Sequence, residues 1–167
     1  SKTDQYPQDD IRVIKNTVDA DVGNLAASDA VKAALAAPPS PNVTVQEVAK
    51  GISLLAGGSH NSVLVEFADH LALIEVPLNE TRTLAVIAKA KEVVPNKPLT
   101  QAVVTHHHFD HSGGLRAAVA EGLTIIAHQS SEAFFKELGE RKHTLFQDAL
   151  AKRPKPLPVP PFSPGSG

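Results

Sequence analysis

No cysteine occurs among the 167 residues of the sequence. This absence excludes disulfide bonds, metal sites built on thiolates and a cysteine nucleophile. It does not select a cellular compartment, because a chain without cysteine fits reducing and oxidising surroundings alike. A cytoplasmic and a periplasmic location therefore both stay open.

Long apolar runs are missing as well. Even the stretch from Leu71 to Ile74 ends at Glu75, far short of the roughly 20 apolar residues that a membrane helix needs. The sequence begins at Ser1 and shows no apolar signal core there, which leaves secretion undecided. We therefore expect a soluble protein without a membrane partner.

Basic charge and aromatic side chains are also scarce. The formal net charge is −2, and there are only six Phe and one Tyr. Such a chain has no broad basic surface to gather phosphates and few rings to stack on bases, so nucleic acid is not expected as a partner. Hydrophobic residues make up 42% and charged residues 20%, which is typical of one globular domain with a buried core.

Three segments differ in composition. Residues 1–42 form an N-terminal segment, in which an alanine-rich stretch over residues 25–37 predicts a short helix ending at Pro38. Residues 43–152 carry the strand and helix patterns of the main domain. Residues 153–167 are rich in proline, which predicts an extended tail without a helix.

The main domain opens with strand patterns. Short runs of β-branched residues and leucine, separated by turn residues, predict strands over residues 43–45, 52–55, 62–67 and 70–74. Ala68 and Asp69 predict a tight turn between the last two runs. These two strands are therefore expected to form an antiparallel hairpin.

Helical spacing follows and then alternates with strands. Asn79 is a suitable cap for a helix that runs to about Val93, and the predicted core face of this helix comprises Leu84, Ile87, Ala88 and the stem of Lys91. Strands are predicted over residues 99–104 and 123–127, with a helix over residues 115–121 between them and a helix capped by Ser130 after them. Alternating strands and helices need crossover connections, so these strands should be parallel. The predicted fold class is α/β, with hairpin strands first and then alternating helices and parallel strands.

A histidine-rich motif, His106-x-His108-x-Asp110-His111, directly follows the strand predicted over residues 99–104. Residues two apart on an extended segment point to the same side, so His106 and His108 are predicted to bind one metal ion while His107 points away. Where the chain turns into a helix, Asp110 and His111 can face a second ion. Imidazole and carboxylate donors suit zinc, with iron or manganese as substitutes.

A histidine run also occurs in purification tags and solvated loops. This run is internal, is interrupted by Phe109 and Asp110, and lies between a strand and Ser112-Gly113-Gly114. The carboxyl end of a parallel strand is where active sites of α/β proteins gather, which favours metal binding. Gly113 and Gly114 would let the backbone pass close to the metal, or would simply form a tight helix entry.

The segment from Thr105 to Gly114 resembles the metal-binding signature of the metallo-beta-lactamase superfamily. The likeness covers about residues 43–128, since residues 56–66 and the hairpin up to Glu75 are similar to the first sheet of that fold. The resemblance implies half of the superfamily's αββα sandwich, in a truncated or half-domain form. The family's third ligand to the first zinc, its bridging aspartate and its last histidine lie in a second half, which this sequence lacks.

The resemblance also implies roles for the motif residues. His106 and His108 would belong to the first zinc site, and Asp110 and His111 to the second, with a bridging hydroxide as nucleophile. Asp110 is thereby the predicted catalytic residue.

Five further residues are candidates for the site. Glu75 stands where the family usually has aspartate, and it is expected to support the ligands from the second coordination sphere, as is His107. His128, at the end of a predicted strand beside the motif, is a candidate extra metal ligand or a residue of the rim. His60 and Asn61, in a glycine-rich loop, are candidates for substrate contact or for turn formation. His143, in a helical stretch flanked by Lys and Arg, is instead expected on the surface.

Two functions follow from these patterns. The first is a zinc-dependent hydrolase of a small molecule that is an ester, lactone, lactam, thioester or phosphodiester. The second is a non-catalytic metal-binding half-domain that needs a complementary half or a second copy, because a bare half exposes an apolar sheet face. A histidine-rich metal buffer explains the position of the motif least well. The motif offers two donors per zinc ion where about four are needed, so we expect the chain alone to bind zinc but to hydrolyse substrates poorly.

Overall fold

The computed structural model describes residues 29–30, 41–143, 147–157 and 161–162. The chain divides into two compact units, Ser1–Pro39 and Ser40–Gly167. In the first unit only residues 29–30 are described, and they are helical. The helix predicted over residues 25–37 therefore lies almost entirely outside the described residues.

Four antiparallel strands form the first part of the sheet. They are β1 (Thr44–Ala49), β2 (Ile52–Ala56), β3 (Ser62–Glu66) and β4 (Leu71–Ile74), and each pairs with the next. Their β-branched and leucine side chains suit a pleated surface, which is why the sequence indicated them. The hairpin predicted between the last two is confirmed.

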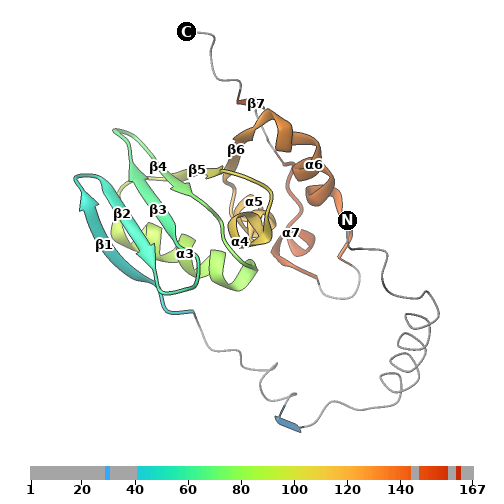
Figure 1. Ribbon diagram of the computed structural model, residues 1–167, viewed down its shortest axis with the longest axis horizontal. Coiled ribbons are helices and arrows are strands. Elements are labelled where there is room, and N and C mark those ends of the chain that lie inside the picture. The colour runs from blue at the N-terminus through green and yellow to red at the C-terminus, as the bar shows by residue number, and fades with distance from the viewer. Residues whose placement is uncertain (1–28, 31–40, 144–146, 158–160, 163–167) are drawn as a thin grey trace, which may run out of the picture. The chain divides into compact units, whose positions relative to one another are not determined.

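The later strands run parallel. β5 (Leu99–Val104) pairs with β4, β6 (Thr124–His128) pairs with β5, and β7 (Pro161–Phe162) pairs with β6. Within the described residues the strands form one seven-stranded sheet in the order β1 to β7 (Figure 1). The proline-rich tail, predicted only to be extended, thus adds a short strand to the sheet.

Helix α3 (Glu80–Val93) connects β4 to β5. Asn79 caps it as predicted, because its side chain accepts a hydrogen bond from the Arg82 backbone N–H at 2.9 Å. The predicted core face is wrong by about one residue: Ala88 and Lys91 are exposed and Leu84 is half-buried, whereas the buried residues are Arg82, Thr83, Val86, Ile87 and Ala90. Contacts from outside the helix set this rotation, since the Thr83 hydroxyl donates to the Pro77 carbonyl at 3.1 Å.

Two short helices lie between β5 and β6. α4 (Phe109–Ser112) and α5 (Leu115–Ala120) are held by the segment that follows β4. The Val76 N–H donates to the His111 carbonyl at 3.0 Å, and the Leu78 N–H donates to the Phe109 carbonyl at 3.1 Å. This backbone clamp fixes α4 against the end of β4.

Gly113 is needed where α4 meets this clamp. A Cβ atom there would collide with the carbonyl oxygens of Leu78 and Phe109, which are backbone atoms that cannot move aside. We expect Gly113→Ala to lower the free energy of unfolding by about 1–3 kcal/mol, the usual cost of overpacking. Denaturant unfolding measures this, with Gly139→Ala as the control because its Cβ would meet only the flexible Leu157 side chain. Equal stability of the two variants would contradict the expectation.

The last helices differ in detail from the sequence prediction. A 3-10 turn (Gln129–Ser131) precedes α6 (Glu132–Glu140), and α7 is Ala149–Lys152. Ser130 was predicted to cap the long helix but does not, because its hydroxyl lies 2.8 Å from His128 Nδ1 and its position belongs to the 3-10 turn. Of the further helical stretch that the sequence indicated, residues 144–146 lie outside the described residues.

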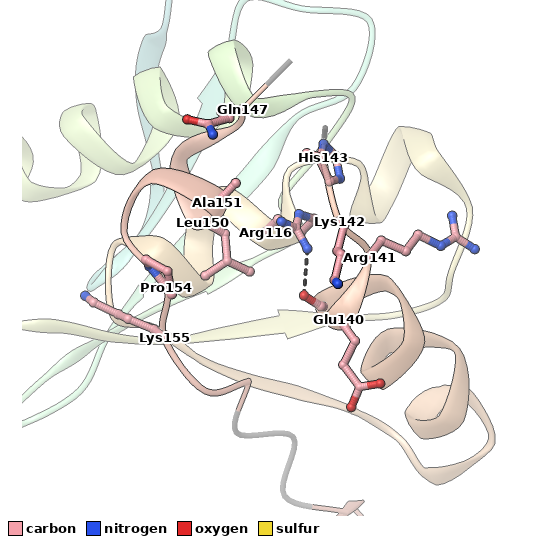
Figure 2. Close-up of a pocket in the computed structure, with 11 residues that line it drawn as sticks. Arg116, Glu140, Arg141, Lys142, His143, Gln147, Leu150, Ala151, Pro154 and Lys155 are labelled. Carbon is pink, nitrogen blue, oxygen red and sulfur yellow. Dashed lines mark hydrogen bonds between the residues drawn. The ribbon is translucent and has the colours of Figure 1, made fainter. Parts of the chain in front are cut away.

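Arg116 ties α5 to α6 and α7. Its guanidinium forms two hydrogen bonds with the carboxylate of Asp148, the residue that caps α7, and donates two more to the carbonyls of Leu138 and Gly139. Figure 2 shows Arg116 among the residues that line the hollow beside this cluster. The hollow beside this cluster has a volume of about 550 Å³. No histidine of the motif lines it, so it is separate from the motif.

One face of the sheet forms the core with the helices. Leu64 and Ile125 alternate along their strands with half-buried residues, and with Leu73 they join a single buried cluster with residues of α3, α5, α6 and α7. The strand register therefore explains which side chains are buried. Among the described residues, no helix combines the length and apolar character that crossing a membrane requires.

The opposite face of the sheet carries an apolar row. Strand register places five side chains opposite one another on adjacent strands: Leu54, Val63, Ile74, Val103 and Ile126. All five are half-buried, and none belongs to the core cluster or packs against it. No described helix covers this row from the other side. We call these five residues the open face.

Candidate metal centre

The histidine motif lies at the carboxyl end of the parallel strand β5, as the sequence predicted. Residues 106–108 lead out of the strand, and α4 begins at Phe109 with His108 as its extended N-cap residue. The motif thus combines an extended half with a helical half. This change of backbone brings His106 and His111 together, with their ring centroids 4.1 Å apart.

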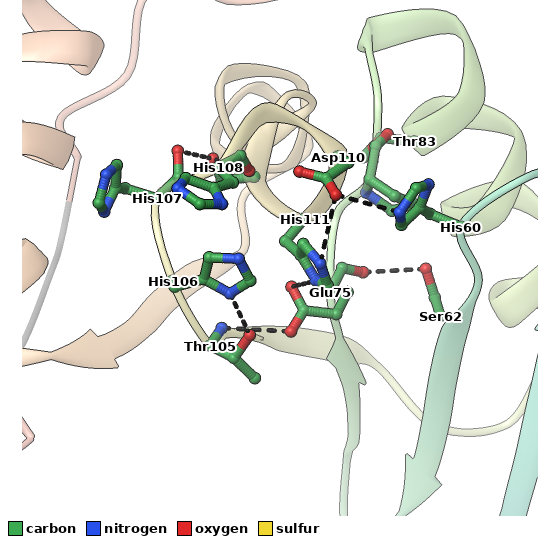
Figure 3. Close-up of polar contacts among 12 residues, drawn as sticks. His60, Ser62, Glu75, Thr83, Thr105, His106, His107, His108, Asp110 and His111 are labelled. Atoms are coloured by element: carbon green, nitrogen blue, oxygen red, sulfur yellow. Dashed lines mark hydrogen bonds and ion pairs between the residues drawn. The ribbon is translucent and has the colours of Figure 1, made fainter. Parts of the chain in front are cut away.

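His106 and His108 are also neighbours, with ring centroids 4.8 Å apart. His107 contacts Phe134 of α6 at 5.2 Å between ring centroids, and Figure 3 shows it on the far side of the loop from His106. The alternation expected of an extended segment therefore holds for these three histidines. The hydroxyl of Thr105 lies 3.0 Å from His106 Nδ1.

A histidine from another part of the chain joins the motif. His60, in the loop between β2 and β3, places Nε2 3.0 Å from Asp110 Oδ2. His111 Nε2 lies 3.5 Å from the same oxygen. One ligand atom from each of these three residues lies within 4.8 Å of the others, and all three side chains are half-buried (Figure 3).

Glu75 supports the motif from behind. Its Oε1 accepts a hydrogen bond from the Thr105 N–H at 3.3 Å, and its Oε2 lies 3.6 Å from His111 Nδ1. Oε2 is buried and has no hydrogen-bond partner apart from this approach. Glu75 also has φ of 70°, in the left-handed region, and such strain is typical of functional positions. This arrangement suits an orienting partner of a metal-binding histidine.

The position of Glu75 gives a testable expectation. Glu75→Gln keeps an oxygen for the Thr105 N–H but removes the charge beside His111, so zinc affinity should fall by about 10–100-fold. Competition with a chromogenic chelator measures the affinity. Glu66→Gln is the control, since Glu66 pairs with Lys97 on the same sheet at 2.6 Å. An affinity that changes equally in the two variants would argue against this role.

Three polar residues that sequence reasoning missed hold these elements in place. The buried Ser112 hydroxyl lies 3.0 Å from both the His107 and the His108 carbonyls, and Ser62 donates to the Glu75 carbonyl at 2.9 Å. A serine near a helix end that bonds back to earlier carbonyls is a known pattern, and only that signal could have singled out Ser112.

Arg82 is the third of these residues. It is 3% exposed, its pKa is lowered by burial, and it donates to the Asn42 carbonyl at 2.8 Å. A Cβ on Gly58 would lie 3.3 Å from Arg82 Nε, so the guanidinium packs against the start of the loop that carries His60. Arg82 therefore packs against the start of that loop and supports it.

His128 and His143 lie apart from this group. His128 is exposed at the end of β6, and its Nδ1 contacts the hydroxyl and the N–H of Ser130. In the described part of the chain no hydrogen bond or ring contact joins His128 to the motif. His143 lies 3.7 Å from Asp148 near α7, and Asn61 is exposed beside His60.

The chemistry of the donor set fits zinc. The donors are imidazole nitrogens and a carboxylate oxygen, and thiolates are ruled out by composition. They come from two separate loops supported by Glu75 and Arg82, which is the kind of rigid support that a metal site requires. The group can therefore hold a divalent metal ion.

The sequence pattern of the metallo-beta-lactamase superfamily matches residues 55–165, a span that contains the whole motif. This is more than half of the 167 residues. The chain belongs to the metallo-beta-lactamase superfamily. The family identified from the motif is thus confirmed, as is the mixed α/β fold class.

Solved metallo-beta-lactamases share the fold. The enzyme from Erythrobacter litoralis, with beta-mercaptoethanol in its active site, is 27% identical with a TM-score of 0.51 over 58% of this chain and 46% of that chain. The metallo-beta-lactamase FIM-1 from Pseudomonas aeruginosa, in its mono-zinc form, is 24% identical with a TM-score of 0.51 over 66% of this chain and 54% of that chain. The chain spans about half the length of the structures it matches.

Proposed function

We propose that this member of the metallo-beta-lactamase superfamily is a zinc-dependent hydrolase, or the half of one that carries the metal motif. The observation behind this proposal is the meeting of the motif side chains at the carboxyl end of β5, with Asp110 Oδ2 between two imidazoles. The substrates proposed are small molecules with an ester, lactone, lactam, thioester or phosphodiester bond.

The metal ligands proposed from the motif are His106, His108, Asp110 and His111. Zinc held there would acidify a water molecule and polarise the carbonyl or phosphoryl oxygen of the substrate. Asp110 is the proposed catalytic residue, because its carboxylate is half-buried and can accept a hydrogen bond from the attacking water. Iron or manganese could replace zinc with the same donors.

Other residues bind and orient. Glu75 Oε2 lies 3.6 Å from His111 Nδ1, on the side of the ring away from Nε2, which is the proposed metal-binding atom. His107 packs on Phe134 and anchors the loop from its outer side. Asn61, exposed in the loop between β2 and β3, is the proposed substrate contact, and His128 remains a proposed ligand at the rim.

Turnover measurements test the proposal. The metal-free chain and the zinc-loaded chain would be assayed with a chromogenic lactam, a lactone, a thioester and a phosphodiester. Zinc-dependent turnover of one of them, lost in His108→Ala and kept in His70→Ala, which changes a histidine outside the motif, supports a hydrolase. Turnover that does not depend on zinc, or that survives His108→Ala, would contradict it.

A non-catalytic metal-binding half-domain is the second candidate. It is favoured by the open face, because an apolar row across five strands calls for a covering partner. We propose that a second copy of the chain or a complementary half covers it. In this case the chain binds zinc but hydrolyses none of the substrates until the open face is covered.

Sedimentation velocity tests the covering of the open face. If a second copy covers it, we expect a dimer that Val63→Lys converts to a monomer, because a charge in the row cannot be buried there. Val48→Lys is the control, since Val48 of β1 is already 56% exposed. The proposal fails if the unmodified chain and Val48→Lys are both monomers and if neither binds a complementary half that is added to it.

A further inference from the structure

His60 reaches the motif from outside it. The histidine lies in the loop between β2 and β3, about 50 residues before the motif in sequence, yet its Nε2 is 3.0 Å from Asp110 Oδ2. We propose that His60 is a metal ligand, which forms a three-donor zinc site with Asp110 and His111. This inference rests on the proposed function only in that the motif must bind metal.

The two imidazoles are oriented in the same way. His111 Nδ1 faces Glu75 Oε2 at 3.6 Å, and His60 Nδ1 faces the Ser59 hydroxyl at 3.2 Å. Each ring therefore has an oxygen on its Nδ1 side, at hydrogen-bond distance for His60 and slightly beyond it for His111, and its Nε2 close to Asp110 Oδ2. Engagement of one ring nitrogen by an oxygen while the other binds the ion is the usual arrangement of metal-bound histidine.

The loop that carries His60 is held at its base. The Arg82 guanidinium donates to the Asn42 carbonyl at 2.8 Å, and a Cβ on Gly57 would collide with that same carbonyl. Gly57 also has φ of 103°, a conformation that other residues rarely adopt. The packing of Asn42 on Gly57 and of Arg82 on Gly58 therefore fixes the start of the loop just before Ser59.

The donor count gives the proposal its chemical reason. The motif alone provides two donors for each of two zinc ions, whereas a catalytic zinc usually has three protein ligands and one open position. With His60, the site at Asp110 and His111 has three. His106 and His108 then remain for the other ion, with their rings 4.8 Å apart.

Two other roles for His60 make different predictions. A histidine that only contacts substrate would change the Michaelis constant and leave metal binding as it is. A histidine that only pairs with Asp110 would lose its pairing when the metal arrives, and its Nε2 would not become bonded to the ion. The proposal requires a bond between His60 Nε2 and the metal.

The test uses metal titration of the full chain after chelator treatment. The unmodified chain and His70→Ala should bind zinc equally at the site of Asp110 and His111, while His60→Ala should lose more than about 100-fold in affinity there, since a lost ligand costs more than a lost supporting contact. His106→Ala should instead lower zinc affinity at the other site, which contains His106 and His108. Equal zinc affinity of His60→Ala and His70→Ala, which changes a histidine outside the motif, would overturn the inference.

Heteronuclear NMR of the imidazole nitrogens gives a second measurement that does not depend on a variant. On loading with cadmium, His60 Nε2 should couple to the metal while His60 Nδ1 does not. Cadmium coupling to motif histidines without coupling to His60 would overturn this inference and leave the proposed function standing. If no histidine couples and no metal binds, the proposed function itself fails.

Discussion

Asp110→Asn is expected to lower zinc-dependent turnover by about 10²–10⁴-fold, the range that a positioned acid or base contributes. The substitution keeps the size of the side chain but removes the charge that faces both His60 Nε2 and His111 Nε2. It therefore replaces a charged metal donor by a weak neutral one and removes the base for the attacking water in one step. Steady-state kinetics on the substrate that the unmodified chain turns over measures the loss.

A matched control separates this effect from a general loss of charge. Asp69→Asn removes a carboxylate that also contacts a histidine, at 2.7 Å in the pair with His70, but on the turn between β3 and β4. Turnover of Asp69→Asn should equal that of the unmodified chain. Comparable losses in both variants, or full activity of Asp110→Asn, would show that Asp110 has no special part in the reaction.

Arg116→Met is expected to lower the free energy of unfolding by about 3 kcal/mol, because it leaves a largely buried carboxylate without its partner. Arg116 is 8% exposed, and its hydrogen bonds join α5 to the Asp148 cap of α7 and to the end of α6. Denaturant unfolding at neutral pH measures the loss. Arg141→Met is the control, since its pair with Glu137 is exposed and contributes little.

The same variant changes the dependence of stability on pH. The hydrogen bond from Arg116 is the main cause that holds the pKa of Asp148 below its ordinary value. A carboxyl group whose pKa is lower in the folded state stabilises the fold above its unfolded pKa, and this stabilisation is lost as pH falls through the folded value. Arg116→Met should therefore lose less stability on acidification than the unmodified chain. Parallel acid profiles would contradict this account of the cluster.

The sequence predicted those parts of the fold that depend on local patterns. The β5 strand was predicted at its observed bounds, because its apolar run is bounded by Pro98 and by the motif. The α3 cap at Asn79 was predicted because a cap depends on a side chain and the next three residues. The position of the motif at the end of a parallel strand followed from the same alternation of strands and helices.

The parts that were not predicted depend on contacts between distant segments. The rotation of α3 is set by Pro77 and Gly114, which lie outside the helix. The approach of His60 to Asp110 depends on the order of strands β2 to β5 in the sheet, which no local pattern contains. The sequence therefore singled out His60 as a site residue without indicating which side chain it would meet.

Calorimetric titration of the metal-free chain with zinc tests the central claim most directly. The unmodified chain should show saturable zinc binding by the donors at the end of β5. The double variant that combines His106→Ala with Asp110→Ala should show no saturable heat, because each candidate site has then lost a ligand. His70, which is half-buried and pairs with Asp69 outside the motif, provides the control: His70→Ala should leave the heats unchanged. Identical titrations of the unmodified chain and the double variant would contradict the account.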